Sequence, residues 1–305
     1  MSKRWLFVLG MLASLAVAFV IVIRNVGVPV PLPEHHGLDG VEVLDGLQFD
    51  VMLPVNAFQQ MTAAPDPDFA VDPDGGIWMI SNGEVWRARE SGESQIAWEQ
   101  LDPDWKGLHS LALTHEGALI AARGLLLTQY SEYTEGQKPL AKLLGLDGLL
   151  LPNKQMKLAS SNLPGTIYAF GTGEEINNRV YGFYDAGETA IICEVPDPVQ
   201  AVADGKEGLY VATAREIYRF DIDGEHKAVM FRQPADAPPI RAIAISPDEK
   251  TLVWSTDKDI NVIEGRASMP LVVGFGGVVR ILKDSLYAYS DARHSLIRIR
   301  LPEPH

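Results

Sequence analysis

Short apolar segments alternate with polar turns along most of the chain. The two clearest copies of this pattern are VQAVADGKEGLYVATAREIYRFDIDG, which begins at Val199, and IRAIAISPDEKTLVWSTDKDINVIEG, which begins at Ile240. Each copy contains an apolar segment, a polar turn, a second segment, a polar break and a third segment. The segments are short, rich in Val, Ile, Tyr and Trp, and bounded by turn residues, as is typical of β-strands. The pattern therefore predicts repeated antiparallel sheets, without an amphipathic helix in each repeat.

The copies have a regular period when they are aligned on the first apolar residue of the second strand. Successive copies are 42, 48, 42, 43 and 34 residues apart, at Ile77, Leu119, Ile167, Leu209, Leu252 and Leu286. A period of about 40–50 residues made of strands alone is typical of β-propeller blades. A ring of such sheets buries the faces of each sheet against its neighbours. The sequence thus predicts an all-β fold, a six-bladed β-propeller.

An uncharged apolar run near the amino terminus predicts one transmembrane helix. Residues 5–23 contain no charge, Lys3 and Arg4 precede them, and Arg24 follows. At 1.5 Å per residue this run approaches the ~30 Å thickness of the hydrocarbon core. A cleaved signal peptide is the alternative, but the run continues beyond the small residues 16–18, where cleavage would occur. We therefore expect a signal-anchor in the inner, cytoplasmic membrane, with the propeller on the periplasmic side.

The last copy ends near Leu301 after three strands, which is one strand fewer than a complete blade. We expect the segment Val41–Leu53 to supply the missing outer strand, so that both ends of the chain close the ring. The predicted organisation is a membrane anchor at 1–24, a proline-rich linker at 25–40 and a propeller at 41–305.

Charge and cysteine content narrow the classes of partner and chemistry. The chain has 26 basic and 40 acidic residues and a net charge of −14, which disfavours nucleic acid as a partner. The single cysteine, Cys193, excludes an intramolecular disulfide, and its apolar strand context predicts a buried thiol. There is no CxxC, HExxH, CxxCH or glycine-rich phosphate loop, so we expect no cofactor.

The segment IRAIAISPDEKTLVWST resembles the strand–turn–strand unit of the senescence-marker/gluconolactonase and strictosidine-synthase-like propellers. The segment IYRFDIDG is similar to outer strands of these and of NHL-repeat propellers, and the likeness extends over roughly 60–300. For the hydrolases of this group the resemblance implies a divalent cation on the axis. Arg241 stands where it implies an Asn ligand, and Thr256 where it implies an Asp, with Asp257 one place later. Because a guanidinium repels a cation, we expect neither a bound metal nor metal-dependent hydrolysis.

Polar residues at the starts of the innermost strands form the candidate site. In a propeller these strands line the axis, and their starts face one mouth of the channel. The residues expected there are His109, Lys157, Gln200, Arg241 and Arg280. Four of them are basic or can become so, and Arg offers paired donors to a carboxylate or phosphate. We expect a site for an anionic ligand or an acidic partner loop; the alternative is a set of unrelated residues solvated at a water-filled mouth.

Two other stretches have alternative interpretations. Asp66, Asp68, Asp72 and Asp74 have the look of a calcium loop, but intervening prolines and a missing distal Glu favour turn capping. The leucine-rich segment Leu140–Leu151 either packs on blade two or forms an apolar protrusion that binds a partner.

The expected function is therefore that of a binding or scaffold module rather than an enzyme. The partner would be a protein of the cell envelope or of a membrane complex, in which the chain would be an accessory subunit. The alternative is a lactonase- or esterase-like hydrolase of the gluconolactonase type.

Overall fold

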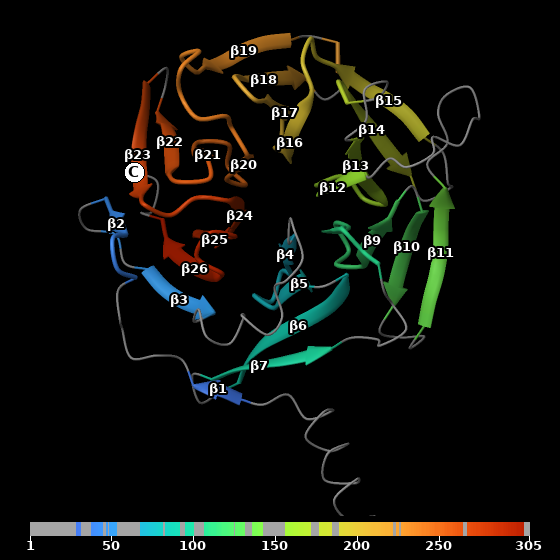
Figure 1. Cartoon of the computed structure of the whole chain (residues 1–305). Helices are drawn as coiled ribbons and strands as arrows, with labels where there is room; N and C mark the ends of the chain where they lie inside the picture. The colour runs from blue at the N-terminus through green and yellow to red at the C-terminus, as the bar shows by residue number, and fades with distance from the viewer. Residues whose placement is uncertain are drawn as a thin grey trace, which may run out of the picture.

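The computed structural model shows a ring of six sheets around a central axis (Figure 1). It describes residues 29–31, 38–44, 47, 49–53, 68–81, 83–91, 95–100, 107–124, 126–131, 136–142, 156–171, 177–184, 189–221, 224–225, 227–264 and 267–301. The predicted all-β, six-bladed propeller is confirmed.

Successive antiparallel strands form each blade, and the first strand of each blade is the innermost. Blade one contains β4 (Phe69–Val71), β5 (Ile77–Ser81), β6 (Glu84–Ser91) and β7 (Gln95–Gln100). Blade two contains β8 (Ser110–Leu113), β9 (Leu119–Arg123), β10 (Leu126–Ser131) and β11 (Gly136–Lys142). Blade three contains β12 (Met156–Ser160), β13 (Thr166–Gly171), β14 (Arg179–Tyr184) and β15 (Thr189–Glu194).

The second half of the ring repeats this arrangement. Blade four contains β16 (Val199–Asp204), β17 (Gly208–Thr213), β18 (Glu216–Asp221) and β19 (Lys227–Arg232). Blade five contains β20 (Ala242–Ile245), β21 (Leu252–Ser255), β22 (Ile260–Glu264) and β23 (Ala267–Val273). Blade six contains β24 (Val278–Leu282), β25 (Ser285–Ser290) and β26 (Ser295–Arg300).

Strands from the amino-terminal side join three different blades. The strand β3 (Phe49–Leu53) pairs with β26 and is the outer strand of blade six. The strand β2 (Glu42–Val43) instead pairs with β23 of blade five, so the range 41–53 does not act as one closing strand. The strand β1 (Pro29–Pro31) pairs with β7 of blade one. Part of the predicted linker is therefore an edge strand, a place where proline is tolerated because the outward N–H is not needed.

Apolar side chains are buried between neighbouring blades. Each of the six clusters of buried apolar residues draws mainly on two adjacent sheets. Between blades six and one, for example, Met52 packs with Phe69, Tyr289 and Leu296. This is the burial that requires a closed ring, because each sheet covers its faces only against its neighbours. Cys193 is buried as predicted, and burial raises the pKa of its thiol to about 12.

Several predictions fall partly or wholly outside the described residues. The predicted anchor at 5–23 lies there, and the described part of the chain has no helix long and apolar enough to cross a membrane. Most of Leu140–Leu151 lies there as well. Asp72 is described, and it caps a turn: its Oδ1 accepts the backbone N–H groups of Asp74 at 3.0 Å and Gly76 at 2.7 Å.

Candidate functional site

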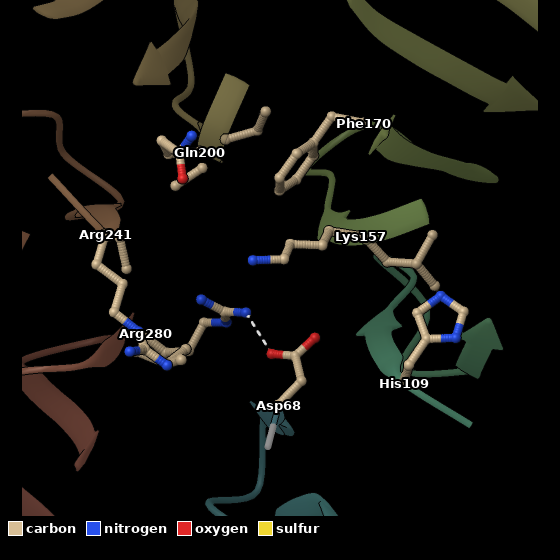
Figure 2. Close-up of a pocket in the computed structure, with 12 residues that line it drawn as sticks. Asp68, His109, Lys157, Phe170, Gln200, Arg241 and Arg280 are labelled. Carbon is tan, nitrogen blue, oxygen red and sulfur yellow. Dashed lines mark hydrogen bonds and ion pairs between the residues drawn. The ribbon is translucent and has the colours of Figure 1, made fainter. Parts of the chain in front are cut away.

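A cavity of about 70 Å³ lies on the axis, at the starts of the innermost strands. Neighbouring inner strands contact one another around the ring, which brings the starts of all six strands to one mouth of the channel. The polar residues that line the cavity are Asp68, His109, Lys157, Gln200, Arg241 and Arg280 (Figure 2). The structure thus brings together all five residues that the sequence pattern placed at the mouth, one from each of blades two to six.

The corresponding position in blade one is occupied by Asp68, which the sequence pattern assigned to an acidic turn. Asp68 directly precedes β4, as His109 precedes β8 and Arg241 precedes β20. This shared position was the signal that could have identified it. Its carboxylate adds a negative charge to a mouth that was expected to be positive.

Asp68 joins three blades through its two carboxylate oxygens. Its Oδ1 accepts the backbone N–H of Phe69 at 2.9 Å and Nη2 of Arg280 in blade six at 2.9 Å. Its Oδ2 accepts the hydroxyl of Ser110 at 2.6 Å and the backbone N–H of Leu111 at 3.2 Å, both in blade two. The Ser110 hydroxyl oxygen in turn accepts a backbone N–H of blade three at 2.9 Å. Asp68 therefore links neighbouring blades, and both of its carboxylate oxygens accept hydrogen bonds from protein donors.

Arg241 is also held by carboxylates. Its Nη1 donates to Asp257 of blade five at 2.5 Å, and its Nη2 donates to Asp291 of blade six. The side chain of Asp257 is 65% exposed and that of Arg241 27%, so this cluster lies at the rim of the mouth. The guanidinium is oriented by two partners and its charge is compensated locally.

His109 is engaged at both ring nitrogens. Nε2 lies 2.8 Å from the carbonyl oxygen of Met156, and the backbone N–H of Gly124 donates to Nδ1 at 3.3 Å. This pattern requires a neutral ring with the proton on Nε2. Burial lowers the pKa of His109, and the cation of Lys157 lowers it further, against the opposing effects of the Met156 carbonyl and Asp68. His109 is therefore not one of the cations of the mouth at neutral pH.

Lys157 and Gln200 differ from the other polar residues of the cavity. Among the described residues, neither side chain makes a hydrogen bond or an ion pair. Figure 2 shows the ammonium group of Lys157 extending into the central space, towards the side on which Arg280 and Arg241 lie. The cavity thus contains an ammonium group and an amide group that make no hydrogen bond to the described residues.

The charge balance of the mouth corrects the expectation of a broad positive face. Arg280 is paired with Asp68, Arg241 is paired with Asp257 and Asp291, and His109 is neutral. Within the part of the chain that the structure describes, Lys157 is the lining cation without a counter-ion. The site is suited to one negative group rather than to a highly charged anion.

The divalent cation that the sequence resemblance implies does not fit these residues. Arg241 lines the cavity where an Asn ligand is implied, and its guanidinium is held between Asp257 and Asp291. Thr256 uses its hydroxyl oxygen to accept two backbone N–H groups of its own turn, both at 3.1 Å. Asp68 has both oxygens engaged, and the described residues contain no group of three His, Cys, Asp or Glu that could hold a metal ion.

Comparison with known proteins relates the chain to others by fold. No protein-family model and no curated protein matches the sequence. A gluconolactonase from Xanthomonas campestris has a TM-score of 0.63 at 12% identity, over 92% of this chain and 99% of its own. Regucalcin, a calcium-binding protein from Agrobacterium tumefaciens, has a TM-score of 0.59 at 11% identity, over 76% and 88%. Virginiamycin B lyase from Staphylococcus aureus has a TM-score of 0.54 at 12% identity, over 86% and 100%.

At these identities the likeness is one of architecture, and a propeller carries many different activities. The fold that the resemblance implied is confirmed: the chain is a six-bladed β-propeller of the type seen in gluconolactonase and regucalcin.

Proposed function

We propose that this propeller is a non-catalytic binding module that takes up an anionic group at the mouth of its axial channel. The observation that carries the proposal is the convergence of polar residues from all six blades on one cavity, with Lys157 left without a counter-ion among the described residues. Arg280 and Gln200 lie in the same cavity and add further donors. Charge-assisted hydrogen bonds from such donors to a carboxylate are among the stronger polar contacts in proteins.

The size of the cavity favours a small anionic group. Its volume is about 70 Å³, whereas pockets for drug-sized molecules are typically about 300–1,000 Å³. A water molecule takes about 30 Å³ of liquid volume, so the mouth has room for a group of a few heavy atoms. The mouth by itself therefore has room for a carboxylate group.

The chemistry of the lining residues supports binding over the hydrolase alternative. A general base needs a free acceptor within reach of the proton that it removes. Both oxygens of Asp68 and both ring nitrogens of His109 are already engaged by the protein. Hydrolysis at this mouth would require breaking contacts that join the blades.

Anion binding by matched variants tests the proposal. Lys157→Gln removes the uncompensated charge and should weaken the binding of acetate by about 1.5–3 kcal/mol, the usual range for hydrogen bonds to charged groups. Arg241→Gln should have a smaller effect, because Asp257 and Asp291 already compensate that guanidinium. Lys250→Gln, at an exposed turn that follows β20, is the control and should change nothing. The proposal is contradicted if neither acetate nor phosphate binds. It is also contradicted if they bind to Lys157→Gln as tightly as to the unmodified chain.

An assay of hydrolysis separates the two functions. We expect no turnover of simple lactones or esters, with or without added divalent cations. Turnover that depends on an added cation and is abolished by Asp68→Asn would favour the hydrolase instead.

We further propose that residues 5–23 anchor the propeller in the inner membrane, on the periplasmic side, as a scaffold or as an accessory subunit of a membrane complex. The support is the uncharged run with basic flanks. Small residues at Gly10, Ala13 and Ser14 would permit close helix packing. Mass spectrometry of the mature chain should find the run still attached, and a mature chain that begins near Phe19 would contradict the anchor. Co-purification in mild detergent would identify the complex.

A further inference from the structure

We infer that the ligand of the mouth is a monocarboxylate with a short apolar chain, whose head lies at Lys157 and whose chain continues along the channel axis. This inference rests on the proposed function and names the ligand class of the same site. It comes from a second cavity that is not part of the mouth.

The second cavity has a volume of about 200 Å³ and lies beside the first. Val202 and Arg280 line both cavities. The mouth is lined by the starts of the inner strands, such as Gln200 and Arg241, whereas the second cavity is lined by their later residues, such as Asp204 and Ile245. The two cavities therefore follow one another along the axis, and Arg280 lies where they meet.

The wall of the second cavity is mostly apolar. Its apolar side chains include Val202, Ile243, Ile245, Ile281 and Leu282. A dry apolar cavity of about 150 Å³ is large enough to bind benzene. The second cavity therefore has room for an apolar group on the order of six carbons.

Electrostatics orient the ligand. The mouth offers the cation of Lys157, whereas the polar side of the second cavity holds Asp204. The carboxylate of Asp204 accepts the hydroxyl of Ser161 at 2.9 Å and the backbone N–H of Asn162 at 2.7 Å, and burial raises its pKa. A carboxylate head placed near Asp204 would meet a like charge, so the head belongs at the mouth and the chain in the second cavity.

Arg280 lies where the two cavities meet and can donate to a carboxylate there. Its guanidinium donates to Asp68 at 2.9 Å and lies 5.6 Å from the centre of the Phe69 ring, which limits its movement. Figure 2 shows it on the same central space that the Lys157 ammonium enters. A carboxylate held there would be near both cations, while the carbon attached to it would point towards the shared wall at Val202.

The test is a calorimetric titration of the full-length chain with a series of straight-chain acids: acetate, butyrate, hexanoate and octanoate. Each buried methylene should tighten binding by about fourfold, as the transfer free energy of a CH₂ group predicts, until the second cavity is full. Hexanol serves as the neutral control, and it should bind much more weakly than hexanoate because it lacks the charged head.

Two variants of the second cavity should change the chain length that binds most tightly, in opposite directions. Ala203→Leu fills part of the cavity and should remove the gain beyond butyrate while leaving acetate affinity unchanged. Leu282→Ala enlarges the cavity and should move the best chain length upwards. Unchanged acetate binding shows that each variant is folded. Lys157→Gln should weaken all the acids by a common factor and leave hexanol unaffected.

The outcomes distinguish the inference from the proposed function. A series in which acetate, butyrate and octanoate bind equally tightly overturns the inference and leaves the anion site standing. An acidic peptide that binds through Lys157 when octanoate does not overturns the inference in the same way. If neither acetate nor phosphate binds, the proposed function fails as well.

Discussion

Blades six and one are joined twice, by two opposite kinds of contact. In the seam, the interface between their facing sheets, Met52 of β3 lies in one buried cluster with Leu296, Tyr289 and Phe69, all of them at most 3% exposed. At the axis the same two blades are joined by the Arg280–Asp68 ion pair, whose side chains are 31% and 14% exposed. The side chains in the seam bury apolar area away from water, whereas the ion pair remains partly exposed to water.

This difference separates what holds the ring closed from what positions the site. Burial of a large apolar side chain contributes about 1.5–3 kcal/mol, whereas ion pairs near the surface often contribute less than about 1 kcal/mol. The axial contacts serve mainly to fix Asp68 and Arg280 in place. Among the described residues they leave Lys157 as the cation without a counter-ion. Changes at the seam should therefore act on stability, and changes at the mouth mainly on binding.

The largest effect on stability is expected at the seam. Met52→Ala should lower the free energy of unfolding by about 2–5 kcal/mol, because it leaves a cavity between two blades. Leu44→Ala is the control: Leu44 is 45% exposed, and its loss should cost less than about 0.5 kcal/mol. Urea unfolding of both variants measures the difference, and equal effects would mean that the Met52 side chain does not stabilise the seam.

A smaller loss of stability is expected at Asp68, which links the blades at the mouth. Asp68→Asn replaces an acceptor oxygen with an amide group that faces donors from Arg280 or Ser110, and it should cost about 1–3 kcal/mol. Asp257→Asn changes an exposed partner of Arg241 and should cost less than about 1 kcal/mol. If urea unfolding shows the same small loss of stability for both substitutions, the contacts of Asp68 do not hold the blades together.

The seam and the mouth also differ in how far the sequence predicted them. The blade period and the starts of the inner strands followed from periodicity alone, and they placed His109, Lys157, Gln200, Arg241 and Arg280 at one cavity. The short strands β1 and β2 left no signal, because three and two residues are too few to show an alternating pattern.

The charge balance of the mouth could not be predicted for a different reason. The partner of Arg241 in blade six, Asp291, is 50 residues away in the sequence, and nothing in the chain between them indicates that they meet. Asp68 lies among other acidic residues, which favoured an interpretation as a turn. The second cavity was equally hidden, because residues such as Val202 and Ile243 look the same in sequence whether they face the axis or a neighbouring blade.

The smallest of the expected effects is a pH dependence at His109. Burial lowers its pKa in the folded chain, so the unfolded chain takes up a proton near pH 6.5 when the folded one does not. Stability should therefore fall as the pH drops through about 6.5, and the loss should stop once the folded ring is protonated as well. His109→Gln keeps a donor for the Met156 carbonyl but cannot titrate, so it should reduce the difference in unfolding free energy between pH 7.5 and 5.5. The nearby charges of Asp68 and Lys157 are retained in this variant, so an unchanged difference would show that His109 is not the titrating group.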